Sequence, residues 1–510
     1  MAAEILINVR PNLTRVAYLE DGVLNDLKIE RQGSPTLVGS IYRGRVVRVL
    51  PGMQAAFVDI GLDRAAFLYV ADVRTDSHIE PRIYVEDEDE EATESADSPE
   101  GERVYIQDLL KEGQTIMVQV AKDPLGTKGA RLTMHVSFPG RYVVYMPTIK
   151  HLGISRRIAN EAERDRLKSL VEQLKPKGGV IVRTACEGAT SDDLSADLDY
   201  LNRIWLEVDK AFDKKKSPGL IHAEIDVELR ALRDLLNERV EKVIVDDPKV
   251  QKKVLTFINQ FMPKHGKSVL LHTGPEPLFD LYDLDLEISR VLERKIWLKS
   301  GGYIVIDEAE ALVVIDVNTG RYVGKKDLED TILKTNLEAI KEIAHQLRIR
   351  NCGGIIIIDF IDMEKTAHRE KVLSQLQLEL ASDMARTTVV SMSELGLVEM
   401  TRKRTRPSLS SLLCEPCPYC EGTGYVKRKS TVAQEIFQAL EREVLRSDQA
   451  GDAVVHCHSA VADWIYEEEQ ESLEAIEAKI KRHVVFKVEP GYHIEQFEIF
   501  SSISGASRPT

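Results

Sequence analysis

Apolar and polar residues alternate along the chain between Gly39 and Val73, in the runs SIYRGRVVRVL, MQAAFVDIG and RAAFLYV. Alternation with a period of two predicts β-strands, and short strands broken by glycines are typical of a small Greek-key barrel. A later run, IMVQVAKD, predicts the strand that closes this barrel. The segment Tyr84–Glu102 separates it from the first three, and its ten acidic residues and lack of Lys and Arg predict an inserted loop.

Within these strands the alternation separates two faces. Phe57 and Phe67 lie on one face, whereas small and aliphatic residues fill the other. If the aliphatic face forms the core, both rings lie on the outer surface, where nucleobases could stack on them. The alternative, that the rings themselves are core, remains open at this level.

A strand, a helix and a second strand are predicted between Gly301 and Met363. SGGYIVIDEAEALVVIDVNTG indicates a hairpin and KKDLEDTILKTNLEAIKEIAHQLRIRN an amphipathic helix. CGGIIIIDFIDM indicates a fully apolar strand that ends at Asp359, and such a strand is expected to bury its end. This order implies parallel pairing of the two outer strands through a crossover. Asp316 and Asp359 should therefore meet at the carboxyl ends of neighbouring strands, where open α/β sheets place their active sites.

Two carboxylates held close together repel each other unless a cation lies between them. Mg²⁺ suits such a site, because it takes one or two carboxylates, keeps several waters and contacts phosphate oxygens. Asp316 and Asp359 are therefore the candidate ligands, and Asn318 could orient a water or a phosphate. Asp362 could support them or be merely solvated. The alternative is that these aspartates only cap turns at strand ends.

Three of the six cysteines, Cys414, Cys417 and Cys420, fall within the run CEPCPYCEGTG. Such clustering favours a metal over a disulfide. A structural zinc site needs four ligands, and no second pair follows, so the remaining ligands are expected from elsewhere, plausibly from another copy of the chain. The alternatives are a reduced surface turn and a redox pair. The redox pair is disfavoured because no thioredoxin-like unit is expected around it.

The chain has 510 residues, which allows several domains, and no apolar run long enough to cross a bilayer. No secretory signal is evident at the start, so we expect a soluble, cytoplasmic protein. The net charge is −15, from 68 basic and 83 acidic residues. Without the ten acidic residues of Tyr84–Glu102 it is 68 − 73 = −5, and Thr401–Arg406 forms a basic cluster, so nucleic-acid binding is not excluded.

Two weaker patterns lie in the middle of the chain. Helical periodicity dominates from Ala223 to Phe261. The strand GGVIVRTA ends in Arg183 and Thr184, a pair that can hold a phosphate but is more often a solvated strand end.

Long runs of the sequence resemble the ribonuclease E/G family, and the length of the chain is similar to that of the family's shorter members. They include IYRGRVVRVLPGMQAAFVDIGLDRAAFL, VQVAKDPLGTKGARLT, LERKIWLKSGGYIVIDEAEALVVIDVNTG, IRNCGGIIIIDFIDM, LGLVEMTRKRTR and CPYCEGTG. The resemblance implies a multidomain α/β and α+β fold, with an OB-type barrel inserted in a ribonuclease-H-like subdomain. A DNase-I-like catalytic domain, a zinc-link and a small C-terminal domain follow. The implied ranges are ribonuclease-H-like parts 1–38 and 223–290, barrel 39–128 with acidic insert 84–102, 5′-monophosphate sensor 129–222, catalytic domain 291–412, zinc-link 413–426 and C-terminal domain 427–510.

The resemblance also implies an activity, hydrolysis of single-stranded RNA by an endoribonuclease that leaves 5′-monophosphate and 3′-hydroxyl ends. It implies a preference for 5′-monophosphorylated substrates and roles in rRNA processing and mRNA decay. Mg²⁺ would bind Asp316 and Asp359 with Asn318 nearby, and one Zn²⁺ would be shared by Cys417 and Cys420 of two chains in a homodimer or a homotetramer. The implied RNA-binding residues are Phe57, Phe67 and Lys122, and the implied sensor residues are Arg183, Thr184 and Arg386.

Two features depart from the family pattern. The acidic insert is not shared, and we expect a solvated loop rather than an RNA mimic. Cys414 precedes the favoured zinc pair and could contribute to the site. Two rival functions remain, a non-catalytic RNA-binding protein and a nuclease that acts on DNA.

Overall fold

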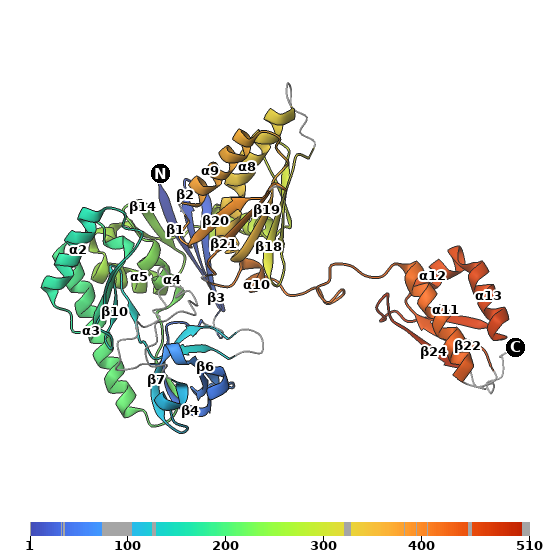
Figure 1. The fold of residues 1–510 in the computed structure, drawn as a ribbon, viewed down its shortest axis with the longest axis horizontal. Helices are drawn as coiled ribbons and strands as arrows, with labels where there is room; N and C mark the ends of the chain where they lie inside the picture. Colours follow the sequence, from blue (N-terminus) through green and yellow to red (C-terminus); the bar gives the residue numbers. More distant parts are fainter. Residues whose placement is uncertain are drawn as a thin grey trace. The chain divides into compact units, whose positions relative to one another are not determined.

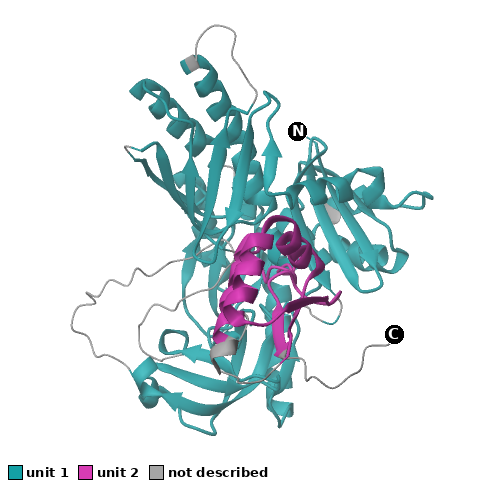
Figure 2. Ribbon diagram, turned by 90° about the vertical axis from the view of Figure 1, so that its right-hand side faces the viewer, with its two compact units in different colours: residues 1–412 teal, residues 413–510 magenta. Residues whose placement is uncertain are grey.

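The computed structural model forms two compact units, residues 1–412 and 413–510 (Figures 1 and 2). It describes residues 2–31, 33, 36–73, 105–124, 129–320, 328–381, 383–393, 395–404, 406–446 and 451–501. The acidic insert predicted at 84–102 lies outside the described residues.

The first sheet joins two segments that are far apart in the sequence. Its strand order is β15-β14-β1-β2-β3, and β1 (Ala3–Arg10) pairs in parallel with β14 (Val240–Val245). The chain between β3 and β14 is therefore inserted into this sheet. The other elements here are β2 (Leu13–Glu20), β3 (Val23–Arg31), α4 (Val227–Leu235), α5 (Pro248–Phe261), β15 (Val269–Leu271), α6 (Leu278–Leu281) and α7 (Leu284–Val291). Helices α4 and α5 make up most of the segment from Ala223 to Phe261, as its helical periodicity predicts, but strand β14 lies between them and was not predicted.

The inserted segment begins with a closed barrel of five strands, in the order β4-β5-β6-β8-β7 with β7 paired back to β4. This ring is consistent with an OB-type fold, and the predicted closing strand is confirmed. Its elements are β4 (Ile41–Leu50), β5 (Ala55–Asp59), β6 (Ala66–Tyr69), α1 (Ile106–Leu109), β7 (Thr115–Lys122) and β8 (Arg131–Thr133). A later strand, β13 (Gly219–His222), pairs with β4 outside the ring.

A smaller sheet follows the barrel, with the order β11-β12-β10-β9 and two long helices packed on it. Its elements are β9 (Phe138–Pro139), β10 (Val143–Met146), β11 (Leu152–Ile154), α2 (Glu161–Leu174), β12 (Gly179–Val182) and α3 (Ser191–Lys214). The N-terminus of α3 is fixed by a capping box between Thr190 and Asp193.

A six-stranded sheet completes the first unit, in the order β16-β17-β18-β19-β21-β20. Two helices, α8 and α9, lie side by side along one of its faces (Figure 1). The elements are β16 (Lys295–Trp297), β17 (Tyr303–Glu308), β18 (Leu312–Asn318), α8 (Leu328–Ile349), β19 (Gly354–Asp359), α9 (Thr366–Leu380), β20 (Thr387–Met392), β21 (Leu397–Arg402) and α10 (Leu409–Leu413). The predicted hairpin, helix and parallel strand are confirmed.

The expectation that the apolar strand ending at Asp359 buries its end is wrong, because Asp359 is exposed. Ile356 and Ile358 are fully buried under the helices, but Ile355 on the other face is 51% exposed. Within unit 1 the described helices thus cover one face of this sheet and leave the other accessible.

The second unit has a three-stranded sheet, β23-β22-β24, with helices packed around it. Its elements are α11 (Lys429–Arg446), β22 (Ala453–Cys457), α12 (Ser459–Glu468), α13 (Gln470–Ile480), β23 (Val484–Val488) and β24 (Phe497–Ser501).

Candidate functional site

The two predicted carboxylates face each other on the accessible side of the six-stranded sheet. Strands β18 and β19 run parallel, and Asp316 and Asp359 are direct partners in their register. Both side chains are exposed, because the residues that alternate with them, such as Ile315 and Ile358, are buried under the helices. Burial of the aliphatic positions therefore forces the carboxylates to the same side, about one strand spacing (~5 Å) apart.

Electrostatics at this point favour a bound cation. Partial burial raises the pKa of Asp359 above its usual range, and the charges of Asp316 and Asp362 raise it further. Keeping neighbouring carboxylates ionised together costs free energy, because their negative charges repel each other. A cation bound between them removes this repulsion. Asn318 Nδ2 donates a hydrogen bond to Asp316 Oδ2 at 2.8 Å, which fixes the amide beside the carboxylates.

The donor set suits a hard cation with few protein ligands. Among the described residues, no group of three or more His, Cys, Asp or Glu side chains is arranged to hold a metal ion. A cation between Asp316 and Asp359 would therefore complete its coordination with water or substrate oxygens, as Mg²⁺ usually does in proteins.

The barrel carries the two predicted rings on its outer surface. Phe57 on β5 and Phe67 on β6 are register partners, with ring centroids 6.1 Å apart and edge-to-face geometry. Both rings are half-buried, whereas Ala56, Val58 and Leu68 on the opposite face are fully buried in the core. The alternative that the rings are core is therefore wrong.

Cations extend the line of these rings around the barrel. Arg131 on β8 is the register partner of both Phe67 and Lys122, and exposed Arg48 on β4 is the partner of Phe57. Arg131 is held in place by an ion pair with the buried Asp72, at 2.9 Å. The sequence analysis missed Arg48 and Arg131. Strict alternation in IYRGRVVRVL would place Arg48 on the face of the buried Tyr42 and Val46, but an irregularity in the pairing between Val46 and Arg48 turns it outward.

The predicted sensor pair lies elsewhere in unit 1, at the end of β12, and it is not a solvated strand end. Arg183 is 8% exposed, donates a hydrogen bond to the Gly140 carbonyl at 2.7 Å and pairs with Asp234 at 2.9 Å. The hydroxyls of Thr184 and Ser155 are 3.1 Å apart. Arg386 is exposed on a different sheet, directly before β20.

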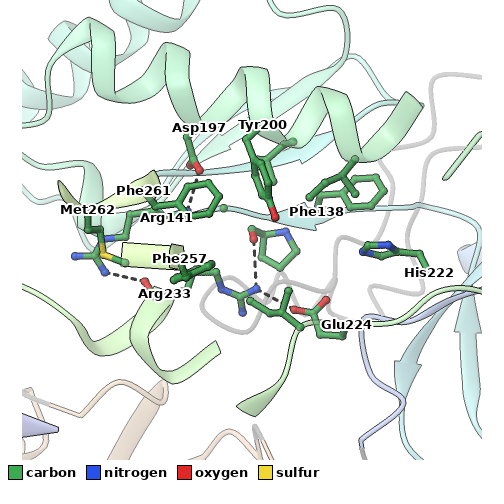
Figure 3. A pocket seen from close by; sticks show the side chains of 15 residues that line it. Phe138, Arg141, Asp197, Tyr200, His222, Glu224, Arg233, Phe257, Phe261 and Met262 are labelled. Carbon is green, nitrogen blue, oxygen red and sulfur yellow. Dashed lines mark hydrogen bonds and ion pairs between the residues drawn. The ribbon is translucent and has the colours of Figure 1, made fainter. Parts of the chain in front are cut away.

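A cavity lies beside this pair, lined by rings such as Phe138, Tyr200 and Phe261 (Figure 3). The polar groups in its wall mainly bind each other. The Asp197 carboxylate accepts the backbone N–H groups of Arg141, Tyr142 and Val143, and Arg233 pairs with Glu224 at 2.9 Å. The cavity wall is thus largely aromatic, and two of its charged side chains, Arg233 and Glu224, pair with each other.

The cysteine segment forms a tight turn in the second unit. Cys420 Sγ accepts the backbone N–H of Gly424 at 3.3 Å. Hydrogen bonds from the N–H groups of Gly424 and Gly422, and from Cys417, lower the pKa of the Cys420 thiol. Thiolate-favouring N–H groups around a paired C-x-x-C suit zinc ligation by Cys417 and Cys420. Cys414 is exposed, and its part in such a site stays a prediction.

The helices within the described ranges include none with the length and apolar character needed to span a membrane.

Comparisons with known proteins give a consistent result. A family model described as "Ribonuclease E/G family" matches residues 137–405, and one described as "RNase E/G, Thioredoxin-like domain" matches residues 416–502. The chain is 46% identical to "Ribonuclease G" of Salmonella typhimurium (strain SL1344) and 45% identical to "Ribonuclease G" of Escherichia coli (strain K12), covering 98% of this chain and 99% of each relative. It is 37% identical to "Ribonuclease E" of Escherichia coli (strain K12), over 91% of this chain but 42% of that protein.

The second match corrects one expectation. A thioredoxin-like domain does surround the C-x-x-C pair, so its absence cannot be used against a redox role. In the structure Cys417 and Cys420 lie in a turn ahead of α11, which begins at Lys429. The groups that lower the pKa of Cys420 therefore belong to this turn and not to a helix N-terminus.

Proposed function

Because this chain belongs to the ribonuclease E/G family and is an endoribonuclease, we propose that it cleaves single-stranded RNA at Asp316 and Asp359. The observation that carries the proposal is the direct pairing of these two carboxylates on the accessible face of the sheet. We further propose that the subdomains follow the family arrangement, with ribonuclease-H-like, OB-type, sensor, DNase-I-like, zinc-link and C-terminal parts.

In this proposal Asp316 and Asp359 hold Mg²⁺, which when bound supplies a Lewis acid and lowers the pKa of a coordinated water. The two aspartates place the cation, and Asn318, whose amide is tied to Asp316, orients a water or a phosphate oxygen. In-line attack by water on the phosphorus leaves a 5′-monophosphate and a 3′-hydroxyl. The exposure of both carboxylates favours this proposal, because a polymer can reach them from the open face.

Selectivity for single strands would arise on the barrel. Phe57 and Phe67 offer aromatic surface to bases, and Lys122, with Arg48 and Arg131, offers charge to phosphates. Bases in a duplex are stacked on one another and paired, so only an unpaired strand can present them to these rings. The 2′-hydroxyl would distinguish RNA from DNA.

We propose that the preference for 5′-monophosphorylated RNA depends on Arg183, Thr184 and Arg386. Arg183 is already paired with Asp234. A bound phosphate would therefore compete with Asp234 for the guanidinium, while the Thr184 hydroxyl and the exposed Arg386 side chain offer further donors. A triphosphate would add bulk and charge that the buried guanidinium cannot accommodate.

We also propose that two chains share one Zn²⁺ through Cys417 and Cys420, giving a homodimer that could assemble into a homotetramer. The turn's backbone N–H groups, first that of Gly424, lower the pKa of the Cys420 thiol, which supports metal ligation. The proposed substrates are rRNA precursors and mRNA, acted on in the cytoplasm during rRNA processing and mRNA decay.

The test is a cleavage assay on one internally labelled single-stranded RNA with either a 5′-monophosphate or a 5′-triphosphate. Asp316→Asn and Asp359→Asn should each lower the cleavage rate by at least about 100-fold, whereas Glu310→Gln, at the far end of the β17–β18 hairpin, should not. The monophosphorylated RNA should be cleaved faster. Normal cleavage by both aspartate variants would overturn the assignment.

Two further arms address the rival functions. Retention of RNA without cleavage at any Mg²⁺ concentration would favour a non-catalytic role. Equal cleavage of a matched single-stranded DNA would favour a nuclease without preference for RNA.

A further inference from the structure

An aromatic pair lies at the edge of the six-stranded sheet. Trp297 on β16 and Tyr303 on β17 are register partners, and their ring centroids are 5.4 Å apart at an interplanar angle of 63°. Trp297 is 61% exposed. A large indole left accessible on a surface is a common mark of a binding site, because its burial by a ligand releases water from apolar area.

A cation is fixed over the same rings. Lys295 Nζ lies 4.2 Å from the centroid of Trp297 and 3.5 Å from that of Tyr303. Such cation–π contacts hold the ammonium near the aromatic faces without neutralising it. Trp297, Tyr303 and Lys295, which we call the edge platform, therefore combine aromatic surface with positive charge.

The edge platform belongs to the same face of the sheet as the carboxylates. Tyr303 is the register partner of Asn318, and Val305, two residues after Tyr303, is the partner of Asp316. Directly opposed residues of antiparallel strands have their side chains on one face. Two strand spacings separate β16 from β18, so Trp297 lies about 10 Å across the sheet from Asn318.

This chemistry fits one nucleotide of a single strand. An unpaired base can stack on aromatic rings whatever its identity, and an ammonium beside the rings can contact a phosphate oxygen. The Phe57–Phe67 pair lies on a separate sheet, so the edge platform would add a contact of its own near the bond that is cleaved. A protein partner would also bury an exposed indole, but it would gain nothing from the neighbouring carboxylates.

We propose that the edge platform binds an unpaired nucleobase of the RNA close to the scissile phosphate. The inference rests on the proposed role of Asp316 and Asp359. It adds a specificity contact, because a base must be free of pairing to occupy the platform.

The first experiment measures binding without cleavage, in EDTA, using a defined single-stranded RNA. The chain has three tryptophans, so tryptophan fluorescence of the wild type is compared with that of Trp297→Phe. RNA should quench the wild type, and the quenched component should be missing from Trp297→Phe, which should still bind RNA nearly as well by anisotropy. Trp297→Ala should bind about 10-fold more weakly. Val390→Ala, at the opposite edge of the sheet and 63% exposed, is the matched control and should bind normally.

The second experiment locates the base. RNAs that lack a single base at successive positions around the cleavage site are cleaved under Mg²⁺. With the wild type, one such RNA should have a KM about 10-fold higher than the RNA that has all its bases. With Trp297→Ala, removal of that same base should not raise the KM further. Trp297→Phe should restore the sensitivity.

Three outcomes would overturn the edge platform. In the first, Trp297→Ala raises the KM of every RNA by the same factor, whichever base is missing. In the second, RNA still quenches the fluorescence of Trp297→Phe as it quenches the wild type. In the third, Trp297→Ala binds RNA normally but has an altered oligomeric state, which would indicate a protein interface. Failure of the proposed function would give a different experimental result. In that case Asp316→Asn and Asp359→Asn would keep cleaving RNA, whatever the Trp297 variants do.

Discussion

Neutralising one of the paired carboxylates should stabilise the metal-free protein while it destroys activity. Asp316 and Asp359 are register partners in parallel strands, and each carboxylate charge disfavours the other. Without a cation the folded state carries this repulsion, whereas the unfolded chain separates the charges. Asp316→Asn or Asp359→Asn removes the repulsion and keeps the shape of the side chain.

The size of the effect follows from the spacing. Two unit charges about 5 Å apart repel by roughly 1–3 kcal/mol for an effective dielectric constant between about 80 and 20. Both side chains are exposed, and solvent screens exposed pairs. We therefore expect the lower end, about 1 kcal/mol of added stability.

Mg²⁺ should make the wild type more stable than the asparagine variants. At a concentration tenfold above its Kd, a cation bound only to the folded state adds about 1.4 kcal/mol to the wild type. The asparagine variants, which lose half of the carboxylate pair, should gain much less. Urea unfolding of each protein in EDTA and in Mg²⁺, with Glu310→Gln in the turn between β17 and β18 as the control, measures both differences.

Two results would refute this reasoning. If both asparagine variants were less stable than the wild type in EDTA, the carboxylates would be supporting the fold through contacts rather than repelling each other. If Mg²⁺ stabilised the wild type and the variants equally, the cation would bind elsewhere.

Three other changes test the remaining surfaces. Replacing Phe57 and Phe67 with alanine should weaken binding of single-stranded RNA, measured by anisotropy, by about 10- to 100-fold, because a stacked base contributes roughly 1–3 kcal/mol; an unchanged Kd would remove the rings from the RNA path. Replacing Cys417 and Cys420 with serine should release zinc and convert dimer to monomer in sedimentation experiments, and a zinc-free dimer would contradict the shared site. Asp234→Asn should destabilise the first unit by about 3 kcal/mol in urea at pH 7, because its guanidinium partners stay buried. Burial raises the pKa of Asp234, but those partners outweigh it and hold the pKa below 3.8, so the difference should shrink as the pH falls below that value, and a constant difference would contradict the pairing.

Much of the fold could be predicted from periodicity, and the exceptions have physical causes. The barrel strands and the β17–β18 hairpin alternate cleanly, because one face of each meets a core. Strand β14 was missed. Its buried residues Val240 and Val243 are three apart, with exposed Glu241 and Lys242 between them, which imitates a helix. Its pairing with β15 and with β1, which lies more than two hundred residues earlier, defines it as a strand.

The site residues could be nominated from the sequence, but their surroundings could not. Arg183 has the sequence context of a strand end, and nothing local indicates that Asp234, on an inserted helix end, pairs with it. The edge platform was likewise missed. Its aromatic pair spans two strands, and the short run KIW carries too little pattern to show which face Trp297 occupies.

The isoleucines of β19 misled the prediction of burial and yet determine the site. A strand of four isoleucines is apolar on both faces, so its sequence cannot show that the described helices of the first unit pack on Ile356 and Ile358 and not on Ile355 and Ile357. Ile356 and Ile358 nevertheless fix the register, because a slip by one residue would expose them and turn Asp359 toward α8 and α9. Burying a carboxylate there without a partner would cost several kcal/mol. The same hydrophobic burial that holds the sheet to its helices therefore keeps Asp359 opposite Asp316 on the accessible face of the sheet.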